Sequence, residues 1–406
     1  MTTANLPDSE STLAVRGTSI PRTVWILGIV SLLMDVSSEM IQTLLPFYLV
    51  SSLGASAVLV GFIEGLSVAI ATATKLVSGV VSDWTGRRKP LAVLGYGLGA
   101  LSKLIFPLAV SVGWIVAAKS IDRVGKGIRG TPRDALIADV TPPELRGASF
   151  GLRKSLDTVG GFIGPLIAIA LMFAFDGNIL AVYWLAIIPA GMAMVLLVVG
   201  IREPKSQSAQ STPAIPRLAD IILLNRAVWV AIGLASLLTL ARFSEAFLLL
   251  KSQEAGFTPA WIPITMVIMH AVYGLTAYPV GRLSDKIGRS GLLVGSIAVL
   301  ATAYIVLAAA SSIGIFILGI VLWGLHMGLS QGLLATLIAD TAPKNLKGTA
   351  FGVFNLITGV VVLVGNVAAG WVWDAHGSST TFFMGAAVST AAMLVVGAMS
   401  LRRKMR

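Results

Sequence analysis

The sequence has no cysteine, only three histidines and few charged residues. Without cysteine there is no disulfide framework, no thiolate metal site and no cysteine nucleophile. His270, His326 and His376 are too scattered for a metalloenzyme motif such as HExxH, so we expect no metal site, no cofactor and no enzymatic activity. The Gly-Lys-Gly stretch at 125–127 lacks the spacing of a Walker loop, which argues against ATP as the energy source.

Hydrophobic residues make up 56% of the 406 residues and charged residues 12%, with a mean hydropathy of +0.87. This composition is typical of a membrane protein. A run of about 20 apolar residues can span a bilayer. Such runs lie near 23–50, 57–81, 90–111, 114–138, 148–173, 180–200, 227–250, 260–281, 291–311, 313–339, 349–371 and 380–400. We therefore predict an all-α membrane protein with twelve transmembrane helices.

The predicted helices fall into two sets of six. The expected organisation is a polar, disordered tail at 1–21, a six-helix half at 22–200, a Pro- and Ser-containing linker at 201–226, a second six-helix half at 227–401 and a short tail at 402–406. No signal peptide is expected before the first helix.

The net charge of +11 lies mostly in the tails and in the loops on one side of the predicted bundle. The loops on the opposite side hold only Lys251. Because basic loops stay in the cytoplasm, this asymmetry predicts a protein of the inner or plasma membrane with both termini cytoplasmic. The placement of the charge argues against nucleic acid as a partner.

Two motifs occur twice, about half a chain apart. Gly-x-x-x-Asp-x-x-Gly-Arg at 79–87 returns at 281–289, and Leu-Ile-Ala-Asp at 136–139 returns at 337–340. A period of half the chain indicates two homologous halves. In membrane transporters built from repeats the substrate site lies at the interface of the repeats.

Two six-helix halves with this motif between helices 2 and 3 and again between helices 8 and 9 resemble the major facilitator superfamily. The resemblance implies that the loop acids and arginines tie helix ends together in one gating state. The residues at the matching positions are Asp83, Arg87, Asp139, Asp285, Arg289 and Asp340. The alternative is a plain turn in which glycine supplies a positive φ.

The predicted helix 5 contains Gly151, Gly160, Gly164 and Pro165. Their spacing resembles a signature of the proton-coupled antiporters of the superfamily, which implies export. The alternative is ordinary packing, since small residues let membrane helices approach closely.

The segments 35–40, 63–65 and 122–129 resemble a broad prokaryotic group of permeases, some associated with nickel resistance. Members of that kind tend to carry a His-rich C-terminal tail, and 401–406 has no histidine.

Charged residues inside predicted membrane helices are candidates for function. Asp35 and Glu39 lie one turn apart on helix 1, near the predicted midplane, where a carboxylate could gain and lose a proton. The alternative is a fixed ion pair with helix 4. Glu245 on helix 7 echoes Glu39, and Arg242 could simply neutralise it.

Helix 4 carries five cations at spacings of 4, 3, 3 and 4, which places them on one face. They are Lys119, Arg123, Lys126, Arg129 and Arg133. Such a face could bind an anionic substrate, because arginine suits carboxylate and phosphate. It could instead form an internal network with Asp35, Glu39, Glu64 and Asp157. Arg123 also resembles the helix 4 arginine that the family ties to proton coupling.

The candidate residues form two groups. The proton-coupling candidates are Asp35, Glu39, Arg123 and Glu245. The substrate-cavity candidates are Lys103, Lys119, Arg123, Lys126, Arg129, Arg242, Tyr273, His326 and Asn355.

These patterns together predict a secondary transporter, monomeric in the lipid bilayer, that exports a small anionic or amphiphilic solute in exchange for protons. One alternative is a nickel, cobalt or other metal efflux permease. Another is an importer of a siderophore or an organic acid.

Overall fold

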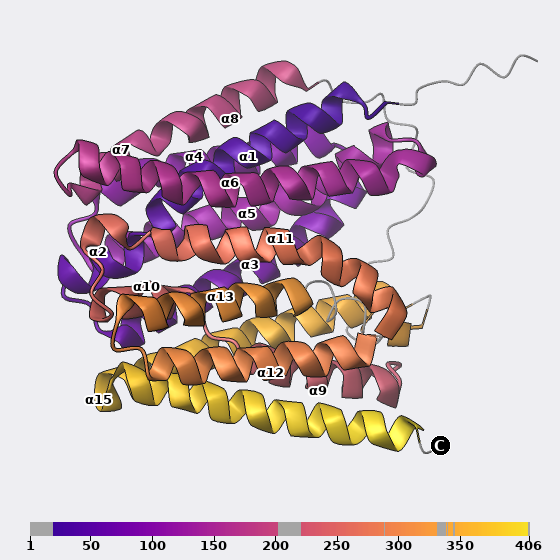
Figure 1. Cartoon of the computed structure of the whole chain (residues 1–406). Helices are drawn as coiled ribbons and strands as arrows, with labels where there is room; N and C mark the ends of the chain where they lie inside the picture. The colour runs from indigo at the N-terminus through magenta and orange to yellow at the C-terminus, as the bar shows by residue number, and fades with distance from the viewer. Residues whose placement is uncertain are drawn as a thin grey trace, which may run out of the picture.

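The computed structural model describes residues 19–201, 221–287, 289–330, 338, 340–343 and 346–404. Within these ranges the chain is helical and contains no strand (Figure 1). Most of the predicted tail 1–21 and linker 201–226 lies outside the described residues. The side chains of 83, 278, 281–290 and 399–404 are likewise outside the description.

The N-terminal half consists of long helices joined by short turns. Its helices are α1 (Arg22–Gln42), α2 (Leu45–Ser51), α3 (Ala57–Thr85), α4 (Arg88–Ile105), α5 (Val112–Val140), α6 (Arg146–Ala174), α7 (Ile179–Leu185) and α8 (Ile187–Gly200). Short 3₁₀ turns at Phe106–Leu108 and Pro143–Leu145 follow α4 and α5. The pairs α1–α2 and α7–α8 each form one apolar segment long enough to span a membrane.

The C-terminal half repeats this plan. Its helices are α9 (Arg226–Leu240), α10 (Ala246–Glu254), α11 (Ile264–Ile287), α12 (Arg289–Ala308), α13 (Ile313–Ser330) and α15 (Lys347–Lys404), with a 3₁₀ turn at Pro259–Trp261. The helix α15 is two helices joined at Gly377, whose φ is 85°. Nine apolar segments within the described ranges are long enough to span a membrane. These nine count α15 as one segment; counting its two parts separately and adding the charged α5 and the short α9 gives the predicted twelve.

The turns between helices follow local sequence signals. The Ser56 side chain accepts a hydrogen bond from the Leu59 amide and begins α3, and Asn178 and Asn225 begin α7 and α9 in the same way. The helix α3 ends at Gly86, which has a φ of 61°. A left-handed residue is a common helix stop and suits glycine. The glycine of the repeated motif therefore does act as a turn residue in its first copy.

Two pairs of helices join the halves: α3 packs against α15, and α6 against α11 (Figure 1). Small residues make the first contact close. A Cβ on Gly65 would lie 2.5 Å from the Cα of Leu363, and one on Gly61 or Gly370 would collide with the backbone of Asn366 or Ala57. Glycine here lets the backbones of the two halves touch.

One end of the molecule is sealed and the other is divided. The largest hydrophobic cluster contains residues of both halves, such as Phe47 and Tyr48 with Phe247 and Phe382. Near the end where α1 begins, separate clusters serve the two halves. The halves therefore share a core at the end of the molecule where α2 and α10 lie. Toward the opposite end they part from one another.

A candidate substrate cavity between the halves

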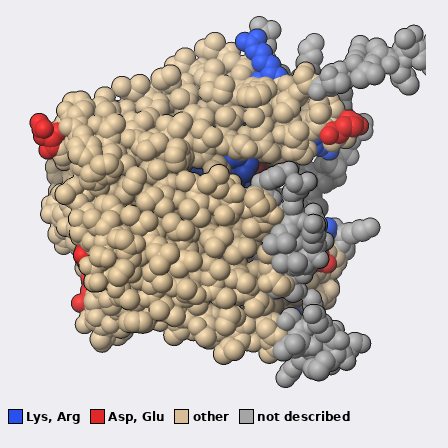
Figure 2. All heavy atoms as spheres, viewed as in Figure 1, with Lys and Arg blue, Asp and Glu red and all other residues tan. Residues whose placement is uncertain are grey.

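A cavity of about 540 Å³ lies where the halves part. We call it the polar chamber. Its described wall includes seven cationic and four acidic side chains: Lys75, Arg123, Lys126, Arg129, Arg133, Arg153 and Lys154, with Asp35, Glu39, Asp134 and Asp157. Figure 2 shows Lys and Arg side chains deep in the recess between the halves, on a surface that is otherwise largely uncharged. The wall thus has an excess of positive charge.

The five cations of α5 do not all face this chamber. Lys119 is 2% exposed and forms an ion pair with Glu64 of α3. Lys103 of α4 is 1% exposed, and its Nζ lies 2.9 Å from Oδ1 of Asp122. Lys103 and Lys119, predicted as cavity residues, therefore lie in buried ion pairs and line none of the three cavities described here. The spacing along α5 predicts a face, but the position of the partner carboxylates depends on the packing of α3, α4 and α5.

The next cations on α5 do line the polar chamber. Nε of Arg123 is 3.6 Å from Oδ2 of Asp122, so Arg123 shares this carboxylate with Lys103. Arg129 lies over the Tyr96 ring at 4.5 Å, and its buried Nη1 has no hydrogen-bond partner. Lys126 is exposed to the cavity and takes part in no ion pair with the residues that the structure describes.

Toward the divided end, acids from α5 and α6 neutralise two of the arginines. Nη1 of Arg153 is 2.9 Å from Asp157, and Nε of Arg133 is 3.1 Å from Asp134. Lys75 and Lys154 line the same wall without an ion pair to any described residue. Within the described part of the chain, these two and Lys126 are thus three lysines of the polar chamber without a carboxylate partner.

Asp35 and Glu39 both face the polar chamber from α1. Neither forms an ion pair within the described ranges. Glycines of α6 pack directly behind them: a Cβ on Gly160 would lie 3.1 Å from the Cβ of Asp35, and one on Gly164 would lie 2.6 Å from the Cβ of Glu39.

The four residues of the predicted helix 5 motif have different surroundings. Gly160 and Gly164 hold α6 against the backbone of α1. Pro165 is buried next to Gly164 within α6. A Cβ on Gly151 would meet no heavy atom within 4 Å. Close packing therefore depends on the two central glycines.

A second cavity, of about 600 Å³, adjoins the polar chamber on the side of the C-terminal half. We call it the apolar chamber. The two chambers share Ser67, Val68, Arg123, Tyr273 and Met327, so they lie side by side with these side chains between them. The surface of the apolar chamber is predominantly apolar because Leu238, Phe243, Leu293, Ile297, Leu300, Phe354 and Val362 line it, beside polar side chains such as Gln42, Thr239, Ser330 and Asn366.

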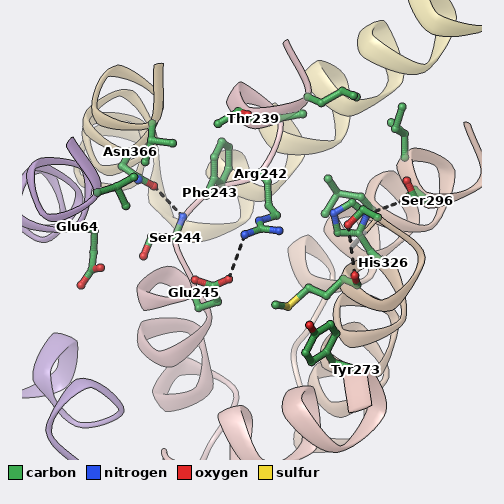
Figure 3. A pocket seen from close by; sticks show the side chains of 18 of the residues that line it. Glu64, Thr239, Arg242, Phe243, Ser244, Glu245, Tyr273, Ser296, His326 and Asn366 are labelled. Atoms are coloured by element: carbon green, nitrogen blue, oxygen red, sulfur yellow. Dashed lines mark hydrogen bonds and ion pairs between the residues drawn. The ribbon is translucent and has the colours of Figure 1, made fainter. Parts of the chain in front are cut away.

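A break in the seventh spanning segment forms part of this wall. The chain leaves α9 after Leu240 and enters α10 at Ala246. The Tyr304 hydroxyl donates to the Ala241 carbonyl at 2.8 Å and accepts from the Phe243 amide at 3.0 Å. Oδ1 of Asn366 accepts from the Ser244 amide at 2.7 Å (Figure 3). Side chains of other helices thus satisfy the backbone groups that the break leaves unpaired.

The charged side chains of the apolar chamber are largely paired. Glu64 is bound by Lys119, and Arg242 Nη2 lies 3.9 Å from Oε1 of Glu245 (Figure 3). The two predicted candidates Arg242 and Glu245 thus come together, and Glu245 also lines a small cavity of about 180 Å³ that it shares with Glu39.

His326 and Tyr273 line the apolar chamber as predicted candidates, whereas Asn355 lines none of the three cavities. On α15 the residues facing the chamber include Phe354 and Asn366. Asn355 follows Phe354 directly, and successive residues of a helix point about 100° apart, so its side chain leaves the chamber.

The predicted gating residues lie near the divided end. In the first copy, Nη1 of Arg88 is 2.6 Å from Oδ2 of Asp139, while Arg87 is exposed at the start of α4. Asp340 is exposed. The side chains of Asp83, Asp285 and Arg289 lie outside the described residues. The arginine that pairs with Asp139 is thus the neighbour of the one expected from the motif.

Several residues of the cavity were not among the predicted site residues, including Lys75 and Lys154 of the polar chamber, and two more are notable. His270 of α11 lines the polar chamber and lies against Gly161 of α6, so it reaches the N-terminal half. Asn366 both lines the apolar chamber and holds the break between α9 and α10. A polar residue within an apolar helix was the available signal for both.

Two six-helix halves with a charged cavity between them define a secondary transporter by architecture. The sequence model of the Major Facilitator Superfamily matches residues 27–366 and 247–405. The chain belongs to this superfamily, and the predicted twelve-helix fold is confirmed.

Similar proteins of the superfamily come from several organisms. An uncharacterised major facilitator-type transporter of Methanocaldococcus jannaschii is 30% identical over 87% of this chain and 89% of its own length. The inner membrane transport protein YajR of Escherichia coli is 25% identical over 93% of this chain and 83% of its own. The multidrug resistance protein MdtH of Proteus mirabilis is 26% identical over 82% of each chain.

Two solved structures show the same fold at low sequence identity. The nucleoside transporter NupG superposes with a TM-score of 0.76 at 15% identity, covering 93% of this chain and 98% of its own. The POT family transporter PepTSo gives a TM-score of 0.74 at 15% identity, covering 96% of this chain and 99% of its own. At this level of identity the likeness concerns the fold alone.

Proposed function

We propose that this transporter exports a small anionic or amphiphilic solute. Protons that move in the opposite direction, into the cell, would drive this export. The observation that carries the proposal is the excess of cations on the polar chamber. Lys75, Lys126 and Lys154 have no carboxylate partner there, and Arg129 has an unbonded Nη1. A cation would be repelled by this wall, whereas an anion would be held by charge-assisted hydrogen bonds.

Asp35 and Glu39 are the proposed proton carriers, with Arg123 and Glu245 as further coupling residues. The two acids face the same chamber as the cations and form no ion pair within the described residues. The charge of a bound substrate would therefore change the proton affinity of these acids, and their protonation would change the affinity for the substrate. The similarity of the helix 5 glycines to antiporters, and of the chain to a protein named for multidrug resistance, supports export.

The proposal extends to the membrane that holds the protein, its orientation there and its oligomeric state. The basic loops support a place in the inner or plasma membrane with both termini in the cytoplasm. On this orientation the polar chamber opens toward the cytoplasm. We take the transporter to act as a monomer.

The repeated turns at the divided end are the proposed gate. The gating residues in this proposal are Asp83, Arg87, Asp139, Asp285, Arg289 and Asp340, and the ion pair between Arg88 and Asp139 joins them. These residues lie at or near helix ends at the divided end, so they would act on the balance between conformations rather than on affinity.

Purified protein in proteoliposomes tests the proposal. Binding is measured by calorimetry for phenylphosphonate, tetraphenylphosphonium and Ni²⁺, and proton movement by an internal pH-sensitive dye. We expect binding of phenylphosphonate alone, weakened about 10- to 100-fold by Lys126→Met, which corresponds to about 1.4–2.8 kcal/mol. Asp35→Asn and Glu39→Gln should abolish proton movement coupled to the phosphonate while the protein stays folded.

The alternatives give different results. Binding of Ni²⁺ that survives Arg123→Ala would favour metal efflux and contradict the anion assignment. Phosphonate and proton moving in the same direction would indicate an importer. Proton movement that is unchanged in both acid variants would remove Asp35 and Glu39 from the coupling mechanism.

A further inference from the structure

The two chambers differ in chemistry although they adjoin one another. The polar chamber belongs mainly to α1, α3, α5 and α6 and has an excess of cations. The apolar chamber belongs mainly to the C-terminal half, and its acids Glu64 and Glu245 each have a cationic partner. A ligand that fills both chambers therefore meets positive charge at one end and a hydrophobic wall at the other.

We infer that the substrate is an amphiphilic acid whose anionic head lies in the polar chamber and whose apolar body lies in the apolar chamber. This inference rests on the proposed function and narrows it. Lys126 and Arg123 would hold the head, and Phe354, Leu238 and Leu293 would contact the body. A cavity of some 300–1,000 Å³ with a largely hydrophobic lining and a few polar groups is the usual form of a small-molecule site.

His326 adds a specific requirement at the apolar end. The residue is 6% exposed and lines the apolar chamber. Its Nδ1 lies 2.7 Å from the Ser296 carbonyl oxygen (Figure 3). A carbonyl oxygen only accepts hydrogen bonds, so Nδ1 carries the proton and the neutral ring leaves Nε2 as an acceptor. Nε2 has no hydrogen bond to any described residue.

Nε2 is therefore an acceptor open to the chamber, and a ligand that supplies a donor there gains a hydrogen bond. We therefore assign to His326 the recognition of a hydroxyl or N–H group on the apolar body. Apolar side chains such as Leu293, Ile297 and Leu300 supply much of the surface of this chamber, so the donor would be a polar group on a largely apolar, aromatic-sized body.

Three probes that share one head group test the inference on the full chain in lipid nanodiscs. Calorimetry compares methylphosphonate, phenylphosphonate and 4-hydroxyphenylphosphonate. We expect phenylphosphonate to bind at least 10-fold more tightly than methylphosphonate, and the hydroxyl group to add a further increase. Phe354→Gln should reduce the advantage of the phenyl group, and Lys126→Met should weaken all three probes alike.

A matched pair of variants isolates Nε2. The amide nitrogen of His326→Asn can replace Nδ1 and keep the contact with Ser296, but the variant lacks an acceptor at the Nε2 position. His326→Gln places an amide oxygen near Nε2. The advantage of 4-hydroxyphenylphosphonate over phenylphosphonate should disappear in His326→Asn and persist in His326→Gln. An advantage equal in both variants and the native protein would overturn the role of His326.

The remaining outcomes separate the inference from the proposed function. Equal affinity for methylphosphonate and phenylphosphonate, both weakened by Lys126→Met, would overturn the amphiphilic substrate and leave the anion transporter standing. If none of the three probes binds, both the inference and the anion assignment are contradicted. Unfolding temperatures measured for every variant show whether a loss of binding comes from misfolding.

Discussion

The carboxylate of Asp374 on α15 caps the first turn of α3, accepting hydrogen bonds from the amides of Ala57 at 2.8 Å and Val58 at 2.9 Å. The contact joins the two halves at the sealed end. Backbone N–H groups at a helix start have no partner within the helix, and a carboxylate there also interacts favourably with the helix dipole. Asp374 therefore stabilises the conformation in which this end is closed.

We expect Asp374→Ala to shift the protein toward conformations in which the sealed end opens. Because Asp374 is exposed, its removal should destabilise the closed conformation of this end by about 1 kcal/mol. This corresponds to about a fivefold change in the ratio of closed to open molecules. The absence of native cysteine allows spin labels at Ser52 and Ser311 for the sealed end and at Glu144 and Lys347 for the divided end.

Asp374→Asn serves as the control, because its amide oxygen can still accept a hydrogen bond, and it should shift the distances less. Distance distributions that are identical in Asp374→Ala and the native protein would show that this cap does not hold the halves together.

A second prediction concerns the buried ion pair between Lys103 and Asp122, whose atoms are 2.9 Å apart and almost fully buried. Asp122→Asn leaves Lys103 buried without its partner and also removes the acid next to Arg123, so it should cost about 3–5 kcal/mol of folding stability. Lys103→Met should cost less, because Arg123 still lies near Asp122. Thermal unfolding in detergent provides the measurement.

Lys126→Met is the matched control for these variants. Lys126 lies on the same helix as Asp122 but faces the cavity and forms no ion pair, so its removal should leave the unfolding temperature nearly unchanged. A loss of stability in Lys126→Met as large as that in Asp122→Asn would contradict the distinction between structural and cavity-lining charges.

Much of the fold could be predicted from the sequence, because its signals are local or repeated. Each spanning helix needs an apolar run of a certain length, and the doubled motif marks the two halves. The interruption at 241–245 was not predicted, since the run at 227–250 is continuous in hydropathy. It depends on Tyr304 and Asn366, which lie far away in the sequence and reach the open backbone only in the packed bundle.

The site was less predictable for the same reason. The spacing of the cations on α5 places them on one face, but Glu64 on α3 determines that Lys119 is buried in a pair while Lys126 remains free for a ligand. The apolar chamber has no sequence signature of its own, because hydrophobic side chains that line a cavity look the same as those that face lipid.

The third prediction concerns the glycines that hold α6 against α1. A Cβ on Gly164 would lie 2.6 Å from the Cβ of Glu39 and 2.8 Å from the Val36 carbonyl oxygen, so Gly164→Ala must push the two helices apart. Overpacking of this kind costs about 1–3 kcal/mol. We expect a lower unfolding temperature and slower transport, since Glu39 would be displaced.

Gly151→Ala is the control on the same helix. Its new methyl group would meet no heavy atom within 4 Å, and alanine favours the helix by about 1 kcal/mol over glycine. Its stability should be equal to or above that of the native protein. Equal losses in the two variants would mean that the cost comes from something other than the contact with α1.

The last prediction concerns Tyr304, whose hydroxyl is bonded to two backbone groups of the break between α9 and α10. Tyr304→Phe keeps the ring and its packing but leaves the Ala241 carbonyl and the Phe243 amide without partners. Each unpaired buried group costs about 1–3 kcal/mol. Amide hydrogen exchange followed by mass spectrometry should show faster exchange in the segment 241–248, and binding of phenylphosphonate should weaken because this segment lines the apolar chamber.

Tyr48→Phe is the comparison, because the Tyr48 hydroxyl makes one hydrogen bond, to the Ala109 carbonyl at 3.2 Å, in a part of the sealed end away from the apolar chamber. Exchange at 241–248 should stay at its native rate in that variant. If exchange there were unchanged in Tyr304→Phe as well, the break would have to be held by Asn366 and the surrounding packing without Tyr304.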